Sequence, residues 1–177
     1  LQHGWRHENH APDGEKKTEL GRHRSAETRL RELAAGHRRM TTLFGEQALP
    51  VLVPPWNRMD ADLLPTLPEL GIHGLSADQP RDQAEPVAGL RVVNIHVDLG
   101  LLAGHPDDGE RLVLGAAVRH LRERRAGRVD AAEPTGLLTH HRVQDGIYDD
   151  FLDRFLAVAA EHPAVRFPSI SDLFAPS

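Results

Sequence analysis

Short apolar runs alternate with longer helical patterns along this 177-residue chain, and this alternation is the feature that most constrains its fold. Short continuous apolar runs favour strands that are buried on both faces, as in a parallel sheet. The stretches between them repeat apolar residues every three or four positions, which is typical of helices that cover such a sheet. The alternation therefore predicts an α/β fold built from βαβ units.

The expected elements follow from these patterns and from the residues that interrupt them. We expect strands at 49–53, 71–76, 90–97 and 135–139, and helices at 25–44, 60–70, 107–126, 145–161 and 171–174. Gly36 favours an interruption of the first helix, and the acidic residues 107–108 are suited to cap the third. Tyr148, Phe151 and Phe155 repeat with the period of a helix face that packs in a core.

Composition limits the class of protein. Apolar residues make up 40% and charged residues 27% of the chain, which is typical of one globular domain over residues 1–177. The 26 acidic residues exceed the 21 basic ones, so we expect no nucleic-acid partner. The absence of Cys excludes disulfides and thiolate ligands. We expect no membrane span, and the sequence leaves open the oligomeric state and the compartment, with a slight preference for the cytoplasm.

Three histidines lie within the first ten residues: His3, His7 and His10. His3 and His7 are four positions apart, so on a first helical turn both rings would project from one face. Two neutral imidazoles arranged in this way can bind a divalent metal. The alternative is a set of surface histidines near a chain end, because this spacing arises easily in a histidine-rich chain.

Polar residues suited to catalysis follow four of the apolar runs. They are His3, Trp56, Asp98 and His140. The carboxyl ends of parallel strands form one rim of an α/β barrel, and this rim is where such barrels place their chemistry. The positions of these four residues therefore favour a metal site over isolated surface histidines.

The ordered set of motifs resembles the polysaccharide deacetylases, the NodB-homology domain of carbohydrate esterase family 4, in a divergent branch. The matching stretches run from residue 1 to about residue 167: His3-Gly4-Trp5-Arg6-His7, Val53-Pro54-Pro55-Trp56, Asp98 and Leu138-Thr139-His140. The resemblance implies a distorted (β/α)7 barrel that lacks its first strand or strands. It also implies a divalent metal, usually zinc, and hydrolysis of acetyl groups on sugars.

The resemblance implies roles for individual residues. His3 and His7 match the two histidine metal ligands, whereas His10 matches no ligand. The third ligand of the family and its general base are paired aspartates on an earlier strand. Neither aspartate is present here, so we expect a front-truncated domain that binds zinc weakly and is inactive as a fragment.

The general acid of the family matches His140, and the aspartate that orients it matches Asp98. A carboxylate partner makes an imidazole more basic and favours the protonated donor. The family usually has Asp-Trp where this chain has Leu101-Leu102, and an arginine where it has Val53. Arg58 is a candidate to replace the charge of that arginine.

The loop Pro55, Trp56, Asn57 and Arg58 is the candidate substrate-binding segment, in which Trp56 either stacks on a sugar ring or fills the core. The expected function is metal-dependent removal of N- or O-acetyl groups from a carbohydrate by metal-activated water. The alternative is a non-catalytic carbohydrate-binding or scaffold barrel. The substrate, the bond type and the metal stay open.

Other histidines receive structural interpretations. His96 is two residues before Asp98, so both side chains are expected on one face, and whether His96 reaches the site stays open. His141 is expected to be structural. A further five histidines are expected to be solvated: His23, His37, His105, His120 and His162.

Overall fold

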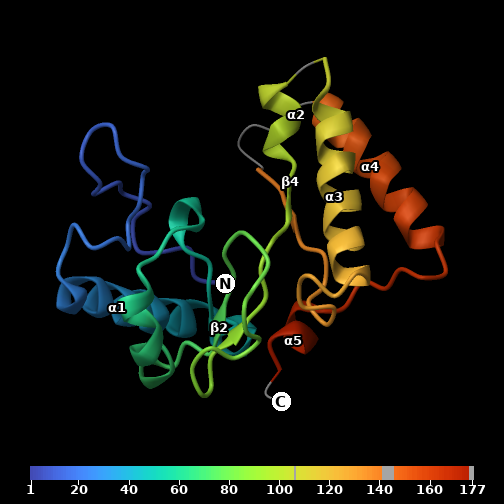
Figure 1. Ribbon diagram of the computed structural model, residues 1–177. Helices are drawn as coiled ribbons and strands as arrows, with labels where there is room; N and C mark the ends of the chain where they lie inside the picture. The colour runs from blue at the N-terminus through green and yellow to red at the C-terminus, as the bar shows by residue number, and fades with distance from the viewer. Residues whose placement is uncertain (106, 141–145, 176–177) are drawn as a thin grey trace. The chain divides into compact units, whose positions relative to one another are not determined.

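The computed structural model describes residues 1–105, 107–140 and 146–175 (Figure 1). The chain divides into two compact units, which are described separately. Unit 1 comprises Leu1–Asn94 and the end of the chain from Phe174, and unit 2 comprises Ile95–Leu173. The single domain expected over residues 1–177 stays a prediction.

Unit 1 is built on a small parallel sheet. Its strands are β1 (Val51–Leu52), β2 (Gly74–Leu75) and β3 (Arg91–Val92), in the order β1-β2-β3. Val51 pairs with Gly74, which pairs in turn with Arg91. The opening segment continues the sheet beyond β1, because Gln2 forms a parallel bridge with Leu52. This bridge places His3 directly beside the end of β1.

Helix α1 (Ala26–Phe44) covers part of this core and is unbroken at Gly36, so the expected interruption is wrong. Ser25 caps its start by accepting a hydrogen bond from the Thr28 backbone N–H, and Gly45 ends it with a φ of 53°. Gly36 is buried because the Gln2 side chain passes over it: a Cβ there would lie 2.4 Å from Gln2 Nε2. The glycine serves close packing rather than a break.

Prolines decide the form of the segment expected as a helix at 60–70. It forms two 3₁₀ helices, η3 (Ala61–Thr66) and η4 (Pro68–Leu70). Two other short 3₁₀ helices precede this segment: η1 (Gly45–Gln47) and η2 (Pro55–Asn57). Pro65 and Pro68 each lack the N–H that an α-helix would use. The core of unit 1 comprises Leu20, Leu33, Leu52, Leu63, Leu67, Ile72, Leu75, Leu90 and Val92.

The single strand expected at 90–97 is wrong. The chain forms β3, leaves the sheet, and then forms β4 (Val97–Asp98) in a different sheet. Asn94 explains the break, because its side chain accepts a hydrogen bond from the Ala77 N–H and donates one to the Gln79 carbonyl, both at 2.9 Å. The buried amide thus binds a neighbouring loop at the point where unit 1 ends.

Unit 2 pairs β4 in parallel with β5 (Leu137–Leu138), so that Asp98 lies opposite Leu138. Its helices are α2 (Gly100–Gly104), which was not expected, α3 (Gly109–Arg125), α4 (Gly146–Glu161) and the short α5 (Ile170–Leu173). Asp108 stands at the start of α3 without capping it through its side chain, which binds Arg111 instead. The core comprises Val97, Leu99, Leu102, Val113, Ala116, Ala117, Tyr148 and Phe151.

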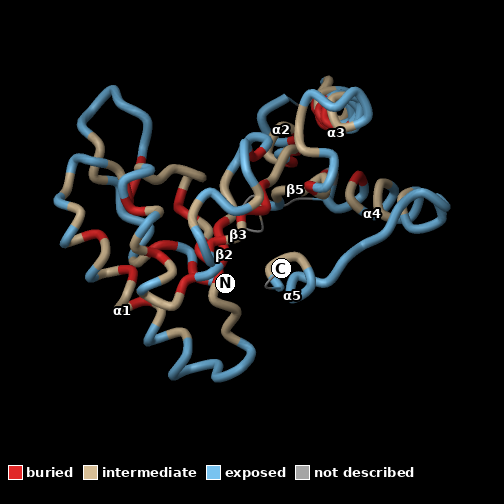
Figure 2. Tube along the Cα trace, turned by 60° about the horizontal axis from the view of Figure 1, so that its bottom comes forward, coloured by how far each residue is buried: buried red, intermediate tan, exposed pale blue. Residues whose placement is uncertain are grey.

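Buried residues follow β2 and β3 in unit 1 and one side of α3 in unit 2 (Figure 2). Tyr148 and Phe151 face the core as their spacing predicts, and Phe155 is half-buried. Within the described residues, β1–β2, β2–β3 and β4–β5 pair in parallel, which agrees with the βαβ interpretation. The (β/α)7 barrel stays a prediction. Within the described residues, no helix combines the length and apolar character needed to span a membrane.

Candidate functional site

His3 is held at the edge of the unit 1 sheet by its own ring. Its Nδ1 lies 2.8 Å from the carbonyl oxygen of Val53, the residue that follows β1. A carbonyl only accepts hydrogen bonds, so Nδ1 carries the proton and Nε2 keeps its lone pair. Metal-binding histidines commonly have their second nitrogen fixed in this way. The exposed His3 ring is thus oriented with Nε2 available as a ligand.

His7 comes close to His3 by a different route from the expected one. The segment is a loop in which Gly4 has a φ of 65° and His7 a φ of 56°, so the expected helical turn is wrong. The two ring centroids nevertheless lie 5.1 Å apart. A reversal of the chain between the histidines replaces the helical spacing as the reason for their proximity.

Glu19 holds this reversal in place. Its carboxylate accepts hydrogen bonds from the backbone N–H groups of Trp5, at 3.1 Å, and Arg6, at 2.7 Å. The carboxylate is only 1% exposed, so these bonds form away from competing water. Gly4 allows the close approach, because a Cβ there would lie 1.9 Å from a Glu19 oxygen.

The loop after β1 packs against His7. The Trp56 ring centroid lies 4.2 Å from that of His7, at an interplanar angle of 53°. Trp56 and Asn57 both have a φ near 55°, a left-handed conformation that costs energy in residues other than glycine. Trp56 is half-buried and Pro55 buried, so the indole is neither a fully enclosed core residue nor a free platform.

Arg58 binds the segment that leads into Glu19. Its guanidinium donates to the Lys17 carbonyl at 3.2 Å, and its own carbonyl accepts from the Thr18 hydroxyl at 3.3 Å. The backbone N–H of His10 donates to the Thr18 carbonyl. Within the described ranges, no third histidine or carboxylate joins His3 and His7 at metal-binding distance. Unit 1 therefore brings two imidazoles together, and their role as metal ligands stays a prediction.

In unit 2 the structure brings together the two residues expected to act as an acid and its partner. His140 Nε2 lies 2.7 Å from Asp98 Oδ1, although 42 residues separate them. The parallel register explains the contact, because Asp98 in β4 lies opposite Leu138 in β5, two residues before His140. Both side chains are partly exposed, at 39% for His140 and 49% for Asp98.

Two further contacts fix this carboxylate–imidazole pair. Asp98 Oδ1 also accepts the Gly100 backbone N–H at 2.7 Å, and the backbone N–H of His140 donates to the Tyr148 hydroxyl at 3.0 Å. Burial raises the pKa of Tyr148 above its usual value, so the phenol stays neutral at pH 7. Gly100 leaves room for both partners, since a Cβ there would approach Asp98 and His140 to about 3 Å.

Unit 2 also contains a buried polar cluster that the sequence patterns did not indicate: His96, His120 and Glu133. His120 was expected to be solvated, but it is only 5% exposed, so that expectation is wrong. Its place on α3 carried the signal, because Val113, Ala116 and Ala117 precede it at helical spacing on the same buried face. Glu133 follows α3 in a turn and carried no comparable signal.

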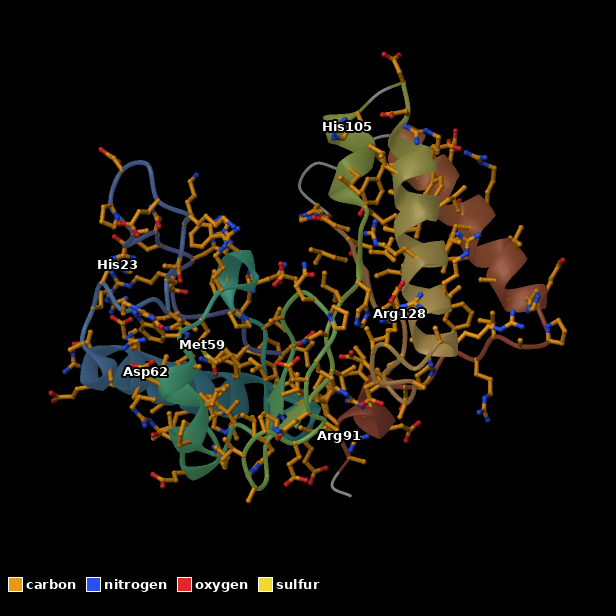
Figure 3. All side chains as sticks on the ribbon, viewed as in Figure 1. His23, Met59, Asp62, Arg91, His105 and Arg128 are labelled. Atoms are coloured by element: carbon orange, nitrogen blue, oxygen red, sulfur yellow. The ribbon has the colours of Figure 1, made fainter. Side chains whose placement is uncertain are left out.

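The remaining histidine expectations have mixed outcomes. His96 does not share the exposed surroundings of Asp98: its side chain is 2% exposed and lies beside Glu133. His105 and His23 are exposed, as expected (Figure 3), and so is His162, whereas His37 is half-buried. His141 lies outside the described residues.

Comparison of the chain with protein-family models, with curated proteins and with solved structures finds no match. The resemblance to the polysaccharide deacetylases therefore rests on the motifs alone. His3 and His7 belong to unit 1, and Asp98 and His140 to unit 2. That the four residues meet around one ion stays a prediction.

Proposed function

We propose that the chain is a metal-dependent hydrolase that removes acetyl groups from a carbohydrate, in the manner of the polysaccharide deacetylases it resembles. The observation that carries the proposal is the solvent-accessible pair Asp98–His140, joined at 2.7 Å. An imidazole oriented by a carboxylate is the usual form of a general acid or base, and it lies here at the carboxyl ends of parallel strands.

His140 acts as the general acid in this proposal. Its Nε2 is occupied by Asp98, so Nδ1 is the nitrogen that gives a proton to the departing amine or alkoxide. The Asp98 carboxylate stabilises the protonated imidazole and fixes its orientation. The Tyr148 hydroxyl and the Gly100 N–H hold the two partners in place. Proton transfer of this kind contributes roughly 100- to 10,000-fold to a rate.

His3 and His7 are the residues that would hold a divalent ion, with zinc favoured by imidazole ligands. The fixed tautomer of His3 and the 5.1 Å between the rings support this assignment. When bound, such an ion supplies Lewis-acid activation of a carbonyl and of water. The neighbouring loop of Pro55, Trp56, Asn57 and Arg58 is the proposed substrate-binding segment, with the partly exposed face of the Trp56 indole available to a sugar ring.

The test measures acetate release from N-acetylated and O-acetylated oligosaccharides, together with metal content. It uses the chain in its natural sequence context, with whatever coding sequence flanks these 177 residues. We expect His140→Ala to keep its metal and to lose acetate release at least about 100-fold. We expect His3→Ala to lose the metal.

His105→Ala is the matched control, because His105 is an exposed histidine of the same unit. An unchanged rate of acetate release in His140→Ala would contradict the proposal. Sugar binding without acetate release in the unmodified protein would favour the non-catalytic carbohydrate-binding protein instead.

A further inference from the structure

The buried cluster of unit 2 is built from three elements that meet inside one compact unit. His96 precedes β4, His120 lies on α3, and Glu133 lies in the turn that leads to β5. His96 Nε2 is 3.2 Å from a Glu133 oxygen, and the His96 and His120 rings stack with centroids 3.6 Å apart. One nitrogen or oxygen from each of the three residues lies within 4.8 Å of the other two.

One nitrogen atom of this cluster has no hydrogen-bond partner among the described residues. His120 Nδ1 bonds the Thr135 hydroxyl at 3.0 Å, but His120 Nε2 is buried and has no hydrogen-bond partner within the described part of the chain. A buried polar atom without a partner is costly, so this buried nitrogen indicates a missing ligand. Glu133 is 0% exposed and lies beside His96, so its carboxylate is close enough to share an ion with the two imidazoles.

We propose that His96, His120 and Glu133 form a second metal site, which takes one divalent transition-metal ion of the zinc class. Two imidazole nitrogens and one carboxylate oxygen suit Zn²⁺, whereas Ca²⁺ and Mg²⁺ prefer oxygen ligands alone. All three side chains are almost fully buried, so the role of the site is to join α3 to the β4–β5 pair rather than to bind a substrate. It involves neither His3 nor His7 and does not depend on the proposed hydrolase.

Metal binding requires a small rearrangement that the hydrogen bonds define. His96 Nδ1 accepts from the Gly136 backbone N–H at 3.1 Å, so its Nε2 carries the proton that it donates to Glu133. The ion displaces that proton, the ring proton moves to Nδ1, and the Gly136 contact breaks. The ligand atoms, now within 4.8 Å of one another, also move closer together, because tetrahedral ligands about 2.1 Å from zinc lie about 3.4 Å from one another.

The cost of this rearrangement is small beside the affinity of such sites. Loss of one neutral hydrogen bond weakens binding about ten-fold. Structural zinc sites reach dissociation constants many orders of magnitude below micromolar, so they tolerate a ten-fold loss. Arg124 carries a positive charge that acts on His120. It binds Thr135, on the Nδ1 edge of His120 and therefore away from the free Nε2.

The experiment uses the full chain with His3→Ala and His7→Ala, so that the opening histidines contribute no binding. After treatment with EDTA, this background chain is titrated with Co²⁺, followed by visible absorption, and with Zn²⁺ in competition. We expect one equivalent of Co²⁺ with the intense bands of a four-coordinate ion. We expect added Zn²⁺ to raise the urea midpoint of unit 2, reported by Tyr148, the chain's one tyrosine.

The variants remove one ligand atom each while keeping the shape of the pocket. His120→Asn retains an amide that can donate to Thr135, and Glu133→Gln retains an acceptor for His96. In the background chain each is expected to raise the Co²⁺ dissociation constant at least about 100-fold, whereas the exposed-histidine control His105→Ala leaves it unchanged. Equal Co²⁺ binding in the background chain and in both variants would overturn the proposal, and so would no Co²⁺ binding by the background chain.

A buried variant that fails to fold, judged by circular dichroism, leaves a decisive measurement on the background chain itself. Added Zn²⁺ is expected to shift the NMR signals of the His96 and His120 rings and of the Gly136 amide. Unmoved signals at these three residues would overturn the proposal. Acetate release is no part of the readout, so failure of the proposed hydrolase leaves this test unaffected.

Discussion

The loop that carries His3 and His7 depends on Gly4, and replacing this glycine with alanine tests how the loop is held. Gly4 has a φ of 65°, a left-handed conformation that is energetically unfavourable for a residue with a Cβ. The new Cβ would also lie 1.9 Å from a Glu19 carboxylate oxygen and 2.6 Å from Pro55 Cγ. The carboxylate is buried and cannot retreat without weakening its bonds to the Trp5 and Arg6 N–H groups.

The two contributions can be estimated separately. The left-handed conformation costs an alanine about 1–2 kcal/mol. Loss of one hydrogen bond to a charged and buried group costs about 1.5–3 kcal/mol more. We therefore expect Gly4→Ala to lower the free energy of unfolding of unit 1 by about 2.5–5 kcal/mol.

Gly14→Ala is the matched control. Gly14 lies in the same unit with a φ of 85°, and nothing lies within 4 Å of where its Cβ would be. Gly14→Ala introduces only the unfavourable backbone conformation, so we expect it to lower the free energy of unfolding of unit 1 by about 1–2 kcal/mol. The difference between the two variants isolates the contact with Glu19.

Urea denaturation followed by tryptophan fluorescence measures this difference. The chain has two tryptophans, Trp5 and Trp56, and both lie in unit 1 beside the loop, so the signal reports this unit. The slope of the transition checks that the same surface unfolds in each variant. Equal losses in Gly4→Ala and Gly14→Ala would show that the buried carboxylate does not hold the loop, and would refute the reasoning.

Three further predictions concern unit 2. Tyr148→Phe removes the acceptor of the His140 backbone N–H, so we expect unit 2 to lose about 1–3 kcal/mol of stability in thermal unfolding; an unchanged midpoint would contradict this. Burial, together with the nearby His96 and Arg124, lowers the pKa of His120 to about 4, below its usual 6.5. As the pH falls, the unfolded state therefore binds a proton at this residue before the folded state does. The free energy of unfolding of the EDTA-treated chain is expected to fall by up to about 3 kcal/mol between pH 6.5 and pH 4. Urea titrations should find a smaller loss in His120→Asn. Gly100→Ala is expected to separate Asp98 from His140 and to lower any acetate release with the metal content unchanged; full activity would show that the 2.7 Å contact is not needed.

The elements with strong periodicity were predictable, and those decided by single side chains were not. The helix expected at 25–44 and the helix expected at 145–161 match α1 and α4 closely, because long amphipathic patterns and their caps specify a helix locally. The strand expected at 90–97 is divided by Asn94, whose amide satisfies two backbone groups of another loop. No local pattern encodes a contact of that kind.

The candidate site likewise contains contacts that the sequence patterns predicted and contacts that they did not. The Asp98–His140 contact follows from two residues placed just after predicted strands that pair in parallel, so strand prediction was enough to anticipate it. His3 and His7 lie close together for a reason that spacing did not provide, since Gly4 and Glu19 reverse the chain between them. Glu133 lies in an irregular turn, where the sequence holds no periodic signal.

Backbone strain in unit 1 is concentrated where the opening histidines lie. Four non-glycine residues of the described chain have positive φ, and three of them are His7, Trp56 and Asn57. At about 1 kcal/mol or more each, these conformations together cost a large share of the stability of an ordinary domain. Glycine at these positions would remove the backbone strain, because it adopts a positive φ at no steric cost. The buried Glu19 carboxylate and the tilted contact between the His7 and Trp56 rings instead hold these strained conformations in place, and the result is one imidazole beside another.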